Sequence, residues 1–269
     1  MDDSQKGAAS SDLDLIVEAA RQAGEVALGF FRQSPEVWWK NEGRSPVSAA
    51  DFAANETLAS ILRPARPGYG WLSEETDDDA ERLSHETVFV VDPIDGTRGF
   101  LSGLELWCVS VAVVTNGRPT AGVLYAPALN ELFVATKSGP ALKNGEPIAV
   151  SGRMGHDVQR LATAEDALHG LSPDFRKTIE RVKHVPSLAY RLAMVADGRL
   201  EGTIVKRNSH DWDLAAADLI LERAGGALVD LSGQPLNYNR ADVSHGELCG
   251  APAVHLPELL RQLAHRRDG

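Results

Sequence analysis

Cysteine is scarce in this sequence, since Cys108 and Cys249 are the only two among 269 residues. Two cysteines are too few for a disulfide framework or a cysteine-built zinc site, and this usage is typical of the reducing cytoplasm, where we expect the protein to act. Long apolar runs are also missing, because no stretch approaches the roughly 18 apolar residues of a membrane-spanning helix. We therefore expect no integral membrane contact.

Basic residues are also few relative to acidic ones. Lys and Arg total 27 against 38 for Asp and Glu, which leaves a formal net charge of −11. Such an acidic chain is poorly suited to a long nucleic-acid backbone, so we expect no such partner. The first residues, MDDSQKGAASSDLD, lack the basic and apolar regions of a signal peptide, and we expect none. The excess carboxylates have two interpretations, a solvated acidic surface or a cluster around divalent cations.

The remaining composition is that of a globular protein, with 43% hydrophobic and 24% charged residues. The length allows one large domain or two modest ones. We expect a disordered tail over residues 1–11, an N-terminal α+β subdomain over 12–150 and a C-terminal α/β subdomain over 151–269.

Apolar spacing predicts the main elements. In the first half we expect helices from about residue 12 and over 48–62, a buried strand over 88–91, and strands over 107–114, 120–125 and 131–135. Asn116-Gly117 is a typical hairpin turn. In the second half we expect helices over 172–182, 188–197 and 212–224, strands over 201–205 and 228–231, and a C-terminal helix opened by Pro257.

Acidic residues gather at three places: Glu74 with Glu75, Asp92 with Asp95, and Asp213 at the expected start of a helix. Each place has an ordinary structural interpretation, as surface charge, turn formers or a charge that complements the helix dipole. The middle pair is harder to explain in that way, because it follows a buried strand directly. The carboxyl ends of such strands are where α/β sheets bind ligands.

The residues after this pair suit a phosphate. Gly96 lets the backbone approach a ligand closely, and Thr97 adds a hydroxyl and a backbone N–H group. Carboxylates are the ligands that Mg²⁺ prefers, and a two-metal site needs several of them close together. The segment therefore combines ligands for hard cations with donors for a phosphate.

Residues 92–97, DPIDGT, resemble the signature of the inositol monophosphatase superfamily. Three further segments resemble its motifs: residues 72–75 (LSEE), residues 212–217 (WDLAAA), and Lys40 with Asp51 around SPVSAA. The chain is thus identified as a member of this superfamily. The resemblance implies an α/β fold (α+β), a layered α/β/α/β/α sandwich of the inositol monophosphatase and fructose-1,6-bisphosphatase type. It also implies sensitivity to lithium and allows a homodimer.

The same resemblance implies the chemistry of the site, a Mg²⁺-dependent hydrolysis of a phosphate monoester with two or three ions. The metal ligands would be Glu74, Asp92, the backbone carbonyl of Ile94, Asp95 and Asp213. The catalytic residues would be Glu74, Thr97 and Asp92, with Glu74 and Thr97 positioning and activating the attacking water. In such sites one ion activates water and another neutralises the phosphate and the leaving oxygen.

Other roles follow from the resemblance too. The backbone amides of Gly96 and Thr97 would hold the phosphate, and Lys40 and Asp51 would support the ligands or a third ion. A haloacid-dehalogenase-like phosphatase, which carries a D-x-D-G-T motif, fits less well. Two residues separate Asp92 from Asp95, and that class gives no role to other acidic groups of this chain.

Within the superfamily, residues 45–51 (SPVSAAD), 122–127 (GVLYAP) and 233–238 (GQPLNY) resemble the CysQ-type 3'(2'),5'-bisphosphate nucleotidases. Lys206 stands where animal inositol monophosphatases have an acidic residue that binds an inositol hydroxyl, and Arg207 follows it. Two cations suit a second phosphate, although they could equally be solvated loop charges.

The expected partner is therefore a small phosphorylated metabolite. Our first substrate is 3'-phosphoadenosine 5'-phosphate, the alternative is inositol monophosphate, and a non-catalytic homologue that binds metal or phosphate comes last. We expect Lys206, Arg207, Ser187 and His210 to contact the substrate. The residues before Trp212, NSHD, depart from the CysQ pattern, so the specificity is less well supported than the chemistry.

Overall fold

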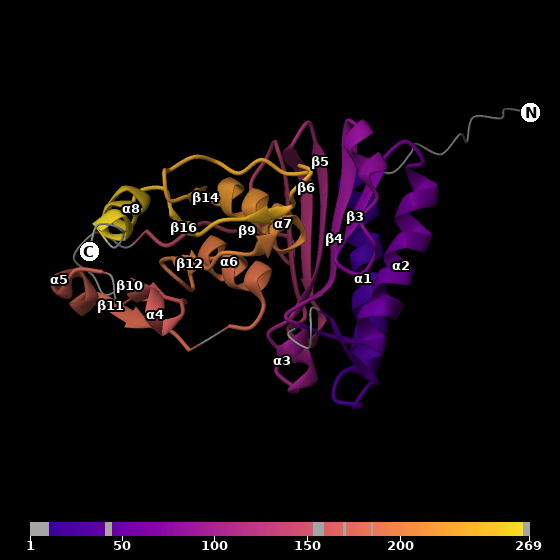
Figure 1. Ribbon diagram of the computed structural model, residues 1–269, viewed down its shortest axis with the longest axis horizontal. Coiled ribbons are helices and arrows are strands. Elements are labelled where there is room, and N and C mark those ends of the chain that lie inside the picture. Colours follow the sequence, from indigo (N-terminus) through magenta and orange to yellow (C-terminus); the bar gives the residue numbers. More distant parts are fainter. Residues whose placement is uncertain (1–10, 41–44, 153–158, 169–170, 184, 266–269) are drawn as a thin grey trace, which may run out of the picture.

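The computed structural model describes residues 11–40, 45–152, 159–168, 171–183 and 185–265 (Figure 1). Of the expected tail over residues 1–11, only Ser11 lies within these ranges. Its side chain accepts a hydrogen bond from the backbone N–H of Asp14 and so caps the first helix.

A mixed sheet of seven strands forms the centre of the molecule, in the order β3-β4-β5-β6-β7-β8-β9. Its strands are β3 (Gly70–Ser73), β4 (Thr87–Asp95), β5 (Cys108–Thr115), β6 (Arg118–Ala126), β7 (Glu131–Thr136), β8 (Leu142–Lys143) and β9 (Glu146–Pro147). The β3–β4 pair is parallel and the other pairs are antiparallel. The expected turn at Asn116-Gly117 is confirmed between β5 and β6, and both residues have positive φ.

Two long helices, α1 (Asp12–Phe30) and α2 (Ala49–Ala65), cover one face of this sheet (Figure 1). Small residues at helical spacing in α1 bring the two helices together, and Leu58 and Leu62 of α2 pack with Phe89 and Val91 of β4. Asp51 accepts hydrogen bonds from the backbone and the hydroxyl of Ser48, which fixes the start of α2 beside the end of β4.

The other face of the sheet is covered by α6 (Leu188–Ala196) and α7 (Asp211–Arg223). Gly122 of β6 permits this packing, because a Cβ there would lie 3.0 Å from the Cα of Ala216 in α7. One apolar core joins these helices to the sheet, so the second half of the chain is packed directly on the first.

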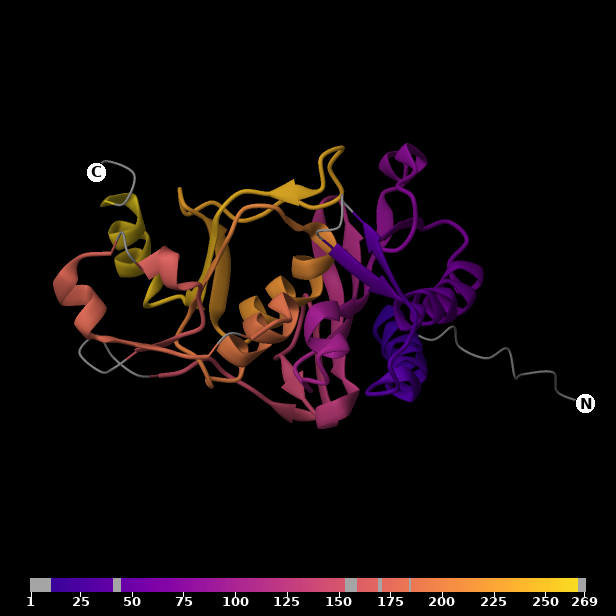
Figure 2. The same ribbon diagram turned by 60° about the horizontal axis from the view of Figure 1, so that its bottom comes forward.

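A second sheet lies beyond α6 and α7, in the order β12-β16-β14, with α8 (Leu256–His265) packed on its outer side (Figure 2). The strands are β12 (Thr203–Val205), β14 (Gly226–Asp230) and β16 (Leu248–Pro252). Helix, sheet, helix, sheet and helix thus follow one another across the molecule, and the predicted α/β/α/β/α sandwich is confirmed.

Shorter elements complete the described chain. They are β1 (Val37–Lys40), β2 (Ser45–Ser48), η1 (Ala80–Ser84), α3 (Thr97–Leu101), η2 (Pro127–Leu129), β10 (Gln159–Leu161), α4 (Glu165–Leu168), α5 (Pro173–Lys177), β11 (Ile179–Arg181), β13 (Ser209–His210) and β15 (Ser244–His245). Among the described residues, no helix is both long enough and apolar enough to cross a membrane.

The predicted helix over residues 172–182 is wrong. The helix ends at Lys177, and Ile179–Arg181 forms β11, parallel to β10. Thr178 and Ile179 are β-branched, which weakens a helix, and β10 offers a strand to pair with. The division into subdomains near residue 150 stays a prediction.

Candidate active site

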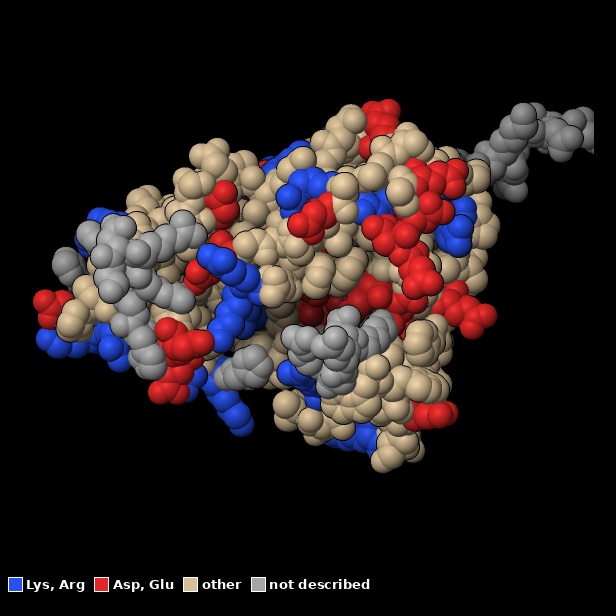
Figure 3. Space-filling view, in the orientation of Figure 1, with Lys and Arg blue, Asp and Glu red and all other residues tan. Residues whose placement is uncertain are grey.

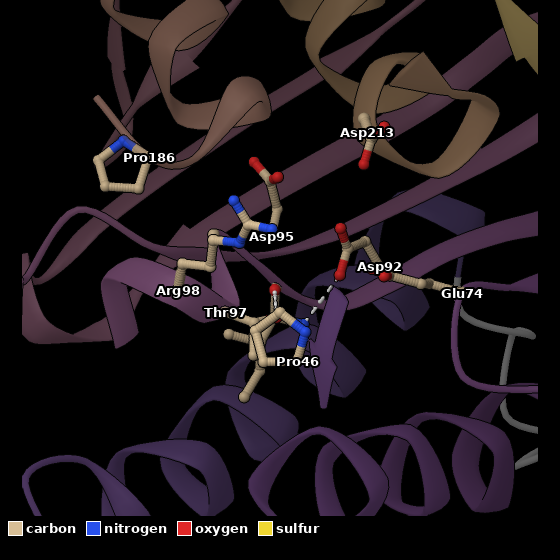
Figure 4. A pocket seen from close by; sticks show the side chains of 10 residues that line it. Pro46, Glu74, Asp92, Asp95, Thr97, Arg98, Pro186 and Asp213 are labelled. Atoms are coloured by element: carbon tan, nitrogen blue, oxygen red, sulfur yellow. Dashed lines mark hydrogen bonds between the residues drawn. The ribbon is translucent and has the colours of Figure 1, made fainter. Parts of the chain in front are cut away.

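A cavity of about 340 Å³ opens where β4 ends, between the seven-stranded sheet and the start of α7 (Figure 4). Its lining residues are Pro46, Glu74, Asp92, Ile94, Asp95, Gly96, Thr97, Arg98, Pro186 and Asp213. Asp92, Asp95 and Asp213 each contribute a carboxylate oxygen to a group whose members lie within 4.8 Å of one another. The chain thus brings together carboxylates that are far apart in sequence.

A β-bulge in β4 places two of these carboxylates together. Asp92 pairs with Ser110 and Asp95 with Cys108, so three steps along β4 match two steps along β5. Residues three apart in a regular strand face opposite sides, and the extra residue cancels that alternation. The Asp92 Oδ1 atom accepts a hydrogen bond of 3.0 Å from the backbone N–H of Ile94, which stabilises the bulge.

Asp95 is held from the other half of the chain. Its Oδ2 atom accepts hydrogen bonds from the Ser187 hydroxyl and, at 2.6 Å, from the backbone N–H of Ala189. Ser187 is fully buried and also caps α6 by accepting from the N–H of Tyr190. Its hydroxyl, which we expected to contact substrate, is engaged with a carboxylate of the cavity.

Asp213 lies in the first turn of α7, and its Oδ2 atom accepts a hydrogen bond of 2.7 Å from the backbone N–H of His210. The neighbouring Asp211 fixes this end of the helix. It is fully buried and accepts hydrogen bonds of 2.7 Å from the N–H of Asn239 and from Nε2 of His245. Asp211 is therefore a structural anchor for the turn that carries Asp213.

Glu74 follows β3, the parallel neighbour of β4. Its backbone N–H donates to the carbonyl of Val91 at 3.1 Å, which brings Glu74 beside Asp92 at the same end of the sheet. In Figure 4 the carboxylates of Asp92 and Asp213 point toward each other, and Glu74 lies next to Asp92. All the side chains that the sequence predicted as metal ligands line one cavity.

In this arrangement the ionised forms of the carboxylates are disfavoured. Burial, followed by the charges of Glu74 and Asp95, raises the pKa of Asp92 well above its usual value. Burial, followed by the charge of Asp213, raises the pKa of Asp95 to about 7. A divalent cation would relieve both the desolvation and the repulsion. The donor set consists of oxygens alone, which fits Mg²⁺ or a similar hard cation.

Thr97 and Asp51 lie behind the carboxylates. The Thr97 Oγ1 atom is 3.0 Å from Oδ1 of Asp51 and 3.1 Å from the backbone oxygen of Ile94, so its proton has two acceptors. Burial raises the pKa of Asp51, and the hydrogen bonds from Ser48 and Thr97 oppose that shift. Gly96 has φ of 97°, and a Cβ there would lie 3.0 Å from Ser187. The predicted role of Lys40 concerns a side chain outside the described part of the structure.

A second cavity of about 430 Å³ adjoins the first and shares Asp95, Pro186 and Asp213 with it. Lys206 and Arg207 are among its lining residues, and their contact with a substrate stays a prediction. Lys206 also pairs with Asp166 at 2.7 Å in an exposed position.

His210, in contrast, is absent from the described lining of both cavities, and its ring stacks on Trp212 with the centroids 4.7 Å apart. Hydrogen bonding to Asp213 raises the pKa of His210. The structure thus brings His210 to the carboxylate of Asp213, and its contact with a substrate stays a prediction.

Two residues of the second cavity, Arg191 and Ser209, were missed by the sequence analysis. A signal was present, because Arg191 follows Ser187 by one helical turn and is the charged residue of the otherwise apolar segment LAYRLAMVA. In the structure Arg191 is half-buried.

Comparisons with known proteins agree with this geometry. A protein-family model, described as the inositol monophosphatase family, matches residues 9–267 of this chain. An inositol-1-monophosphatase from Mesorhizobium japonicum is 34% identical, with 84% of this chain and 88% of the relative covered. A histidinol-phosphatase from Chlorobaculum parvum is 32% identical, with 83% and 87% covered.

Solved structures are similar as well. The Thermotoga maritima IMPase superposes with a TM-score of 0.84 at 26% identity and covers 95% of this chain and 98% of its own. The extragenic suppressor protein suhB from Bartonella henselae gives 0.80 at 28% identity, with 94% and 98% covered.

Proposed function

The chain belongs to the inositol monophosphatase family and is a phosphoric monoester hydrolase, and we propose that it hydrolyses small phosphate monoesters with Mg²⁺ as its metal. The observation that carries the proposal is the group of oxygens from Asp92, Asp95 and Asp213, within 4.8 Å of one another, in a cavity that Glu74 and Thr97 also line. Such a group would serve as the ligand set of a metal-assisted hydrolysis.

Inositol 1-phosphate is the first monoester to test. The sequence pattern favoured 3'-phosphoadenosine 5'-phosphate, but the relatives described above carry the names of inositol and histidinol phosphatases. These names support the alternative better than the nucleotide. Histidinol phosphate is a second candidate, because the histidinol-phosphatase is nearly as similar to this chain as the inositol enzyme.

The proposed mechanism assigns a task to each side chain. Glu74, Asp92, Asp95 and Asp213, with the carbonyl of Ile94, would hold the metal. Bound there, Mg²⁺ supplies Lewis acidity to a phosphoryl oxygen and lowers the pKa of a water molecule. The protein keeps its carboxylates aimed at the cavity through the β4 bulge and the donors from Ser187 and Ala189. This preorganisation lets the ligands act without rearranging.

Water activation would depend on two further groups. When the Thr97 hydroxyl donates to Asp51 at 3.0 Å, its lone pairs are free to accept a hydrogen bond from the attacking water. The half-buried carboxylate of Glu74 would accept the proton that the water loses. The attack would be in line with the leaving oxygen, and no covalent phosphoenzyme is required.

A substrate panel tests the proposal. Phosphate release is measured with Mg²⁺ from inositol 1-phosphate, histidinol phosphate, 3'-phosphoadenosine 5'-phosphate and fructose 1,6-bisphosphate. We expect turnover of inositol 1-phosphate, a drop of at least about 1,000-fold for Asp92→Asn, and parent-like rates for the exposed control Asp174→Asn. Absence of turnover for every compound, or parent-like rates for Asp92→Asn, would overturn the proposal.

A further inference from the structure

Arg82 is a buried arginine to which the proposed mechanism gives no task. It lies in η1, on the connection between β3 and β4, and only 1% of its side chain is exposed. It is not among the residues that line the cavity of the metal-binding carboxylates. Because a guanidinium stays charged in proteins, burying one is unfavourable unless its N–H groups are hydrogen-bonded. Its partners therefore indicate what the burial achieves.

Arg82 is hydrogen-bonded to two segments that are far apart in the sequence. Its Nε and Nη2 atoms donate to the two carboxylate oxygens of Asp78, at 2.6 and 2.9 Å. Nη1 donates to Oδ1 of Asn239 at 2.7 Å, and Nη2 also donates to the backbone oxygen of Arg240 at 3.0 Å. Asn239 follows Arg82 by 157 positions. A single side chain thus ties the β3–β4 connection to the second half of the chain.

Asn239 carries this connection to the start of α7. Its backbone N–H donates to Oδ2 of Asp211 at 2.7 Å, while Oδ1 of the same carboxylate lies 2.7 Å from Nε2 of His245. Asp211 is fully buried, and both of its oxygens are engaged. The first turn of α7, which carries Asp213, is therefore held by its neighbours. We call the connected residues the Arg82 relay: Asp78, Arg82, Asn239 and Asp211.

The relay joins two parts of the chain that each supply a carboxylate to the cavity. At one end of the relay, Asp78 follows Glu74 by four residues. At the other end, Asp211 precedes Asp213 by two residues. Glu74 and Asp213 line the same cavity, although one follows β3 and the other lies in the first turn of α7. The relay is thus a hydrogen-bonded link, outside the cavity, between the segments that bring these two carboxylates together.

The carboxylates need such a link because they repel one another. Figure 3 shows acidic side chains gathered on the floor of a hollow in this face of the molecule. Burial, followed by the charges of Glu74, Asp95 and Asp213, raises the pKa of Asp92 well above its usual value. Without a constraint, this repulsion would favour conformations in which the start of α7 lies farther from β4. Ligands that are already in place lose less conformational freedom when an ion binds.

We propose that Arg82 is a positioning residue of the metal site, which acts through Asn239 and Asp211 to hold Asp213 close to the other carboxylates. The inference rests on the proposed function, because that function assigns Mg²⁺ to these carboxylates. It predicts that loss of the Arg82 side chain weakens Mg²⁺ binding, although Arg82 does not line the cavity.

Two variants break the relay at the same hydrogen bond. Arg82→Met removes the donors. Asn239→Gly removes the acceptor but keeps the backbone N–H that binds Asp211, and glycine tolerates the φ of 55° found there. The Kd of Mg²⁺ is measured by calorimetry on the free protein, without substrate. We expect each variant to weaken Mg²⁺ binding by about tenfold. The double variant should also be about tenfold weaker rather than a hundredfold, because both changes break one link.

Arg160→Met is the matched control. Arg160 lies in β10 and makes the same kinds of contact as Arg82, since it donates to both carboxylate oxygens of Glu201 and to the backbone oxygen of Gly198. Its loss leaves the buried Glu201 without this partner and should lower the melting temperature. It should leave the Kd of Mg²⁺ unchanged. The comparison separates a positioning role from a general loss of stability.

The outcomes separate this inference from the proposed function. A parent-like Kd of Mg²⁺ in Arg82→Met, or an equal weakening in Arg160→Met, would overturn the positioning role. If Arg82→Met does not fold, Asn239→Gly decides in the same way, because it leaves the pair of Arg82 with Asp78 in place. The Kd values require no turnover. Failure to hydrolyse every compound of the panel would therefore overturn the function alone, and a tenfold weakening in the relay variants would still support the inference.

Discussion

The hydroxyl of Ser187 donates a hydrogen bond to the carboxylate of Asp95, 92 positions away in the sequence. The N–H of Ala189 donates to the same oxygen at 2.6 Å, so the start of α6 orients a carboxylate that extends from the end of β4. Packing of the second half of the chain onto the first is therefore part of how the site is built, and the predictions below depend on that arrangement.

Ser187→Ala should weaken metal binding. Loss of the donor frees the Asp95 carboxylate to turn, and loss of a partner behind a metal ligand commonly costs about 10- to 100-fold in metal affinity. The measurement is the Mg²⁺ concentration that gives half-maximal phosphate release. Ser172→Ala is the matched control, because Ser172 also caps a helix but does so on α5. Equal Mg²⁺ requirements for the parent and Ser187→Ala would contradict the positioning role.

Thr97→Val should lower kcat with little effect on the fold. Valine has nearly the same shape as threonine but cannot bond to Asp51 or Ile94, so the proposed water would lose its orienting hydroxyl. We expect a fall of about 100-fold or more in kcat. Thr97→Ser restores the hydroxyl and should recover most of the rate. A Thr97→Val enzyme as fast as Thr97→Ser would remove Thr97 from the mechanism.

Asp218 should make stability depend on pH. Asp218 is a buried residue of α7 and accepts a hydrogen bond of 2.8 Å from the hydroxyl of Tyr238, and burial raises its pKa to about 6. The folded pKa lies above the unfolded value of 3.8, so its stabilising contribution is complete below pH 3.8 and is lost as the pH rises through about 6.

The test compares urea unfolding of the parent and Asp218→Asn between pH 4 and pH 7. The asparagine keeps an acceptor for Tyr238 but does not ionise. Relative to this variant, the parent should lose on the order of 2–3 kcal/mol of unfolding free energy over that range. Titration of the active-site carboxylates is common to both proteins and cancels. A constant difference between the two proteins would show that Asp218 does not titrate in this way.

Gly122→Ala should destabilise the protein, because its Cβ would lie 3.0 Å from the Cα and 3.1 Å from the backbone oxygen of Ala216. Neither atom can move without shifting α7, so we expect a cost of about 1–3 kcal/mol. Gly29→Ala is the contrasting change, since a Cβ on this exposed turn of α1 meets nothing within 4 Å. It should stabilise by about 0.5–1 kcal/mol. Thermal melting of both variants measures the difference, and a parent-like Gly122→Ala would argue against the close helix–sheet packing.

Much of the candidate site was predictable because its residues fall in short, ordered segments. Glu74, Asp92, Asp95 and Asp213 all line the cavity as the family resemblance implied. The geometry that unites them was not predictable, because the β4 bulge depends on the register with β5 rather than on any local pattern. Ser187 illustrates the same limit, since its hydrogen bond to the distant Asp95 depends on how the two halves of the chain pack.

The second half of the chain was harder to predict. Ile179 joins a strand because β10 lies beside it, and a window of sequence cannot reveal that neighbour. Arg191 was passed over for Lys206 and Arg207, which stand next to the recognisable motif but are exposed.

Phosphate release from inositol 1-phosphate across a Mg²⁺ titration, for the parent and Asp213→Asn, tests the central claim most directly. Asp213 reaches the cavity from α7. The Asn variant therefore removes one carboxylate from the group that Asp213 forms with Asp92 and Asp95, without changing any residue of β4. The account predicts release that rises with Mg²⁺ in the parent and falls by at least about 1,000-fold in the variant. Release that is independent of Mg²⁺, or equal in the two proteins, would contradict it.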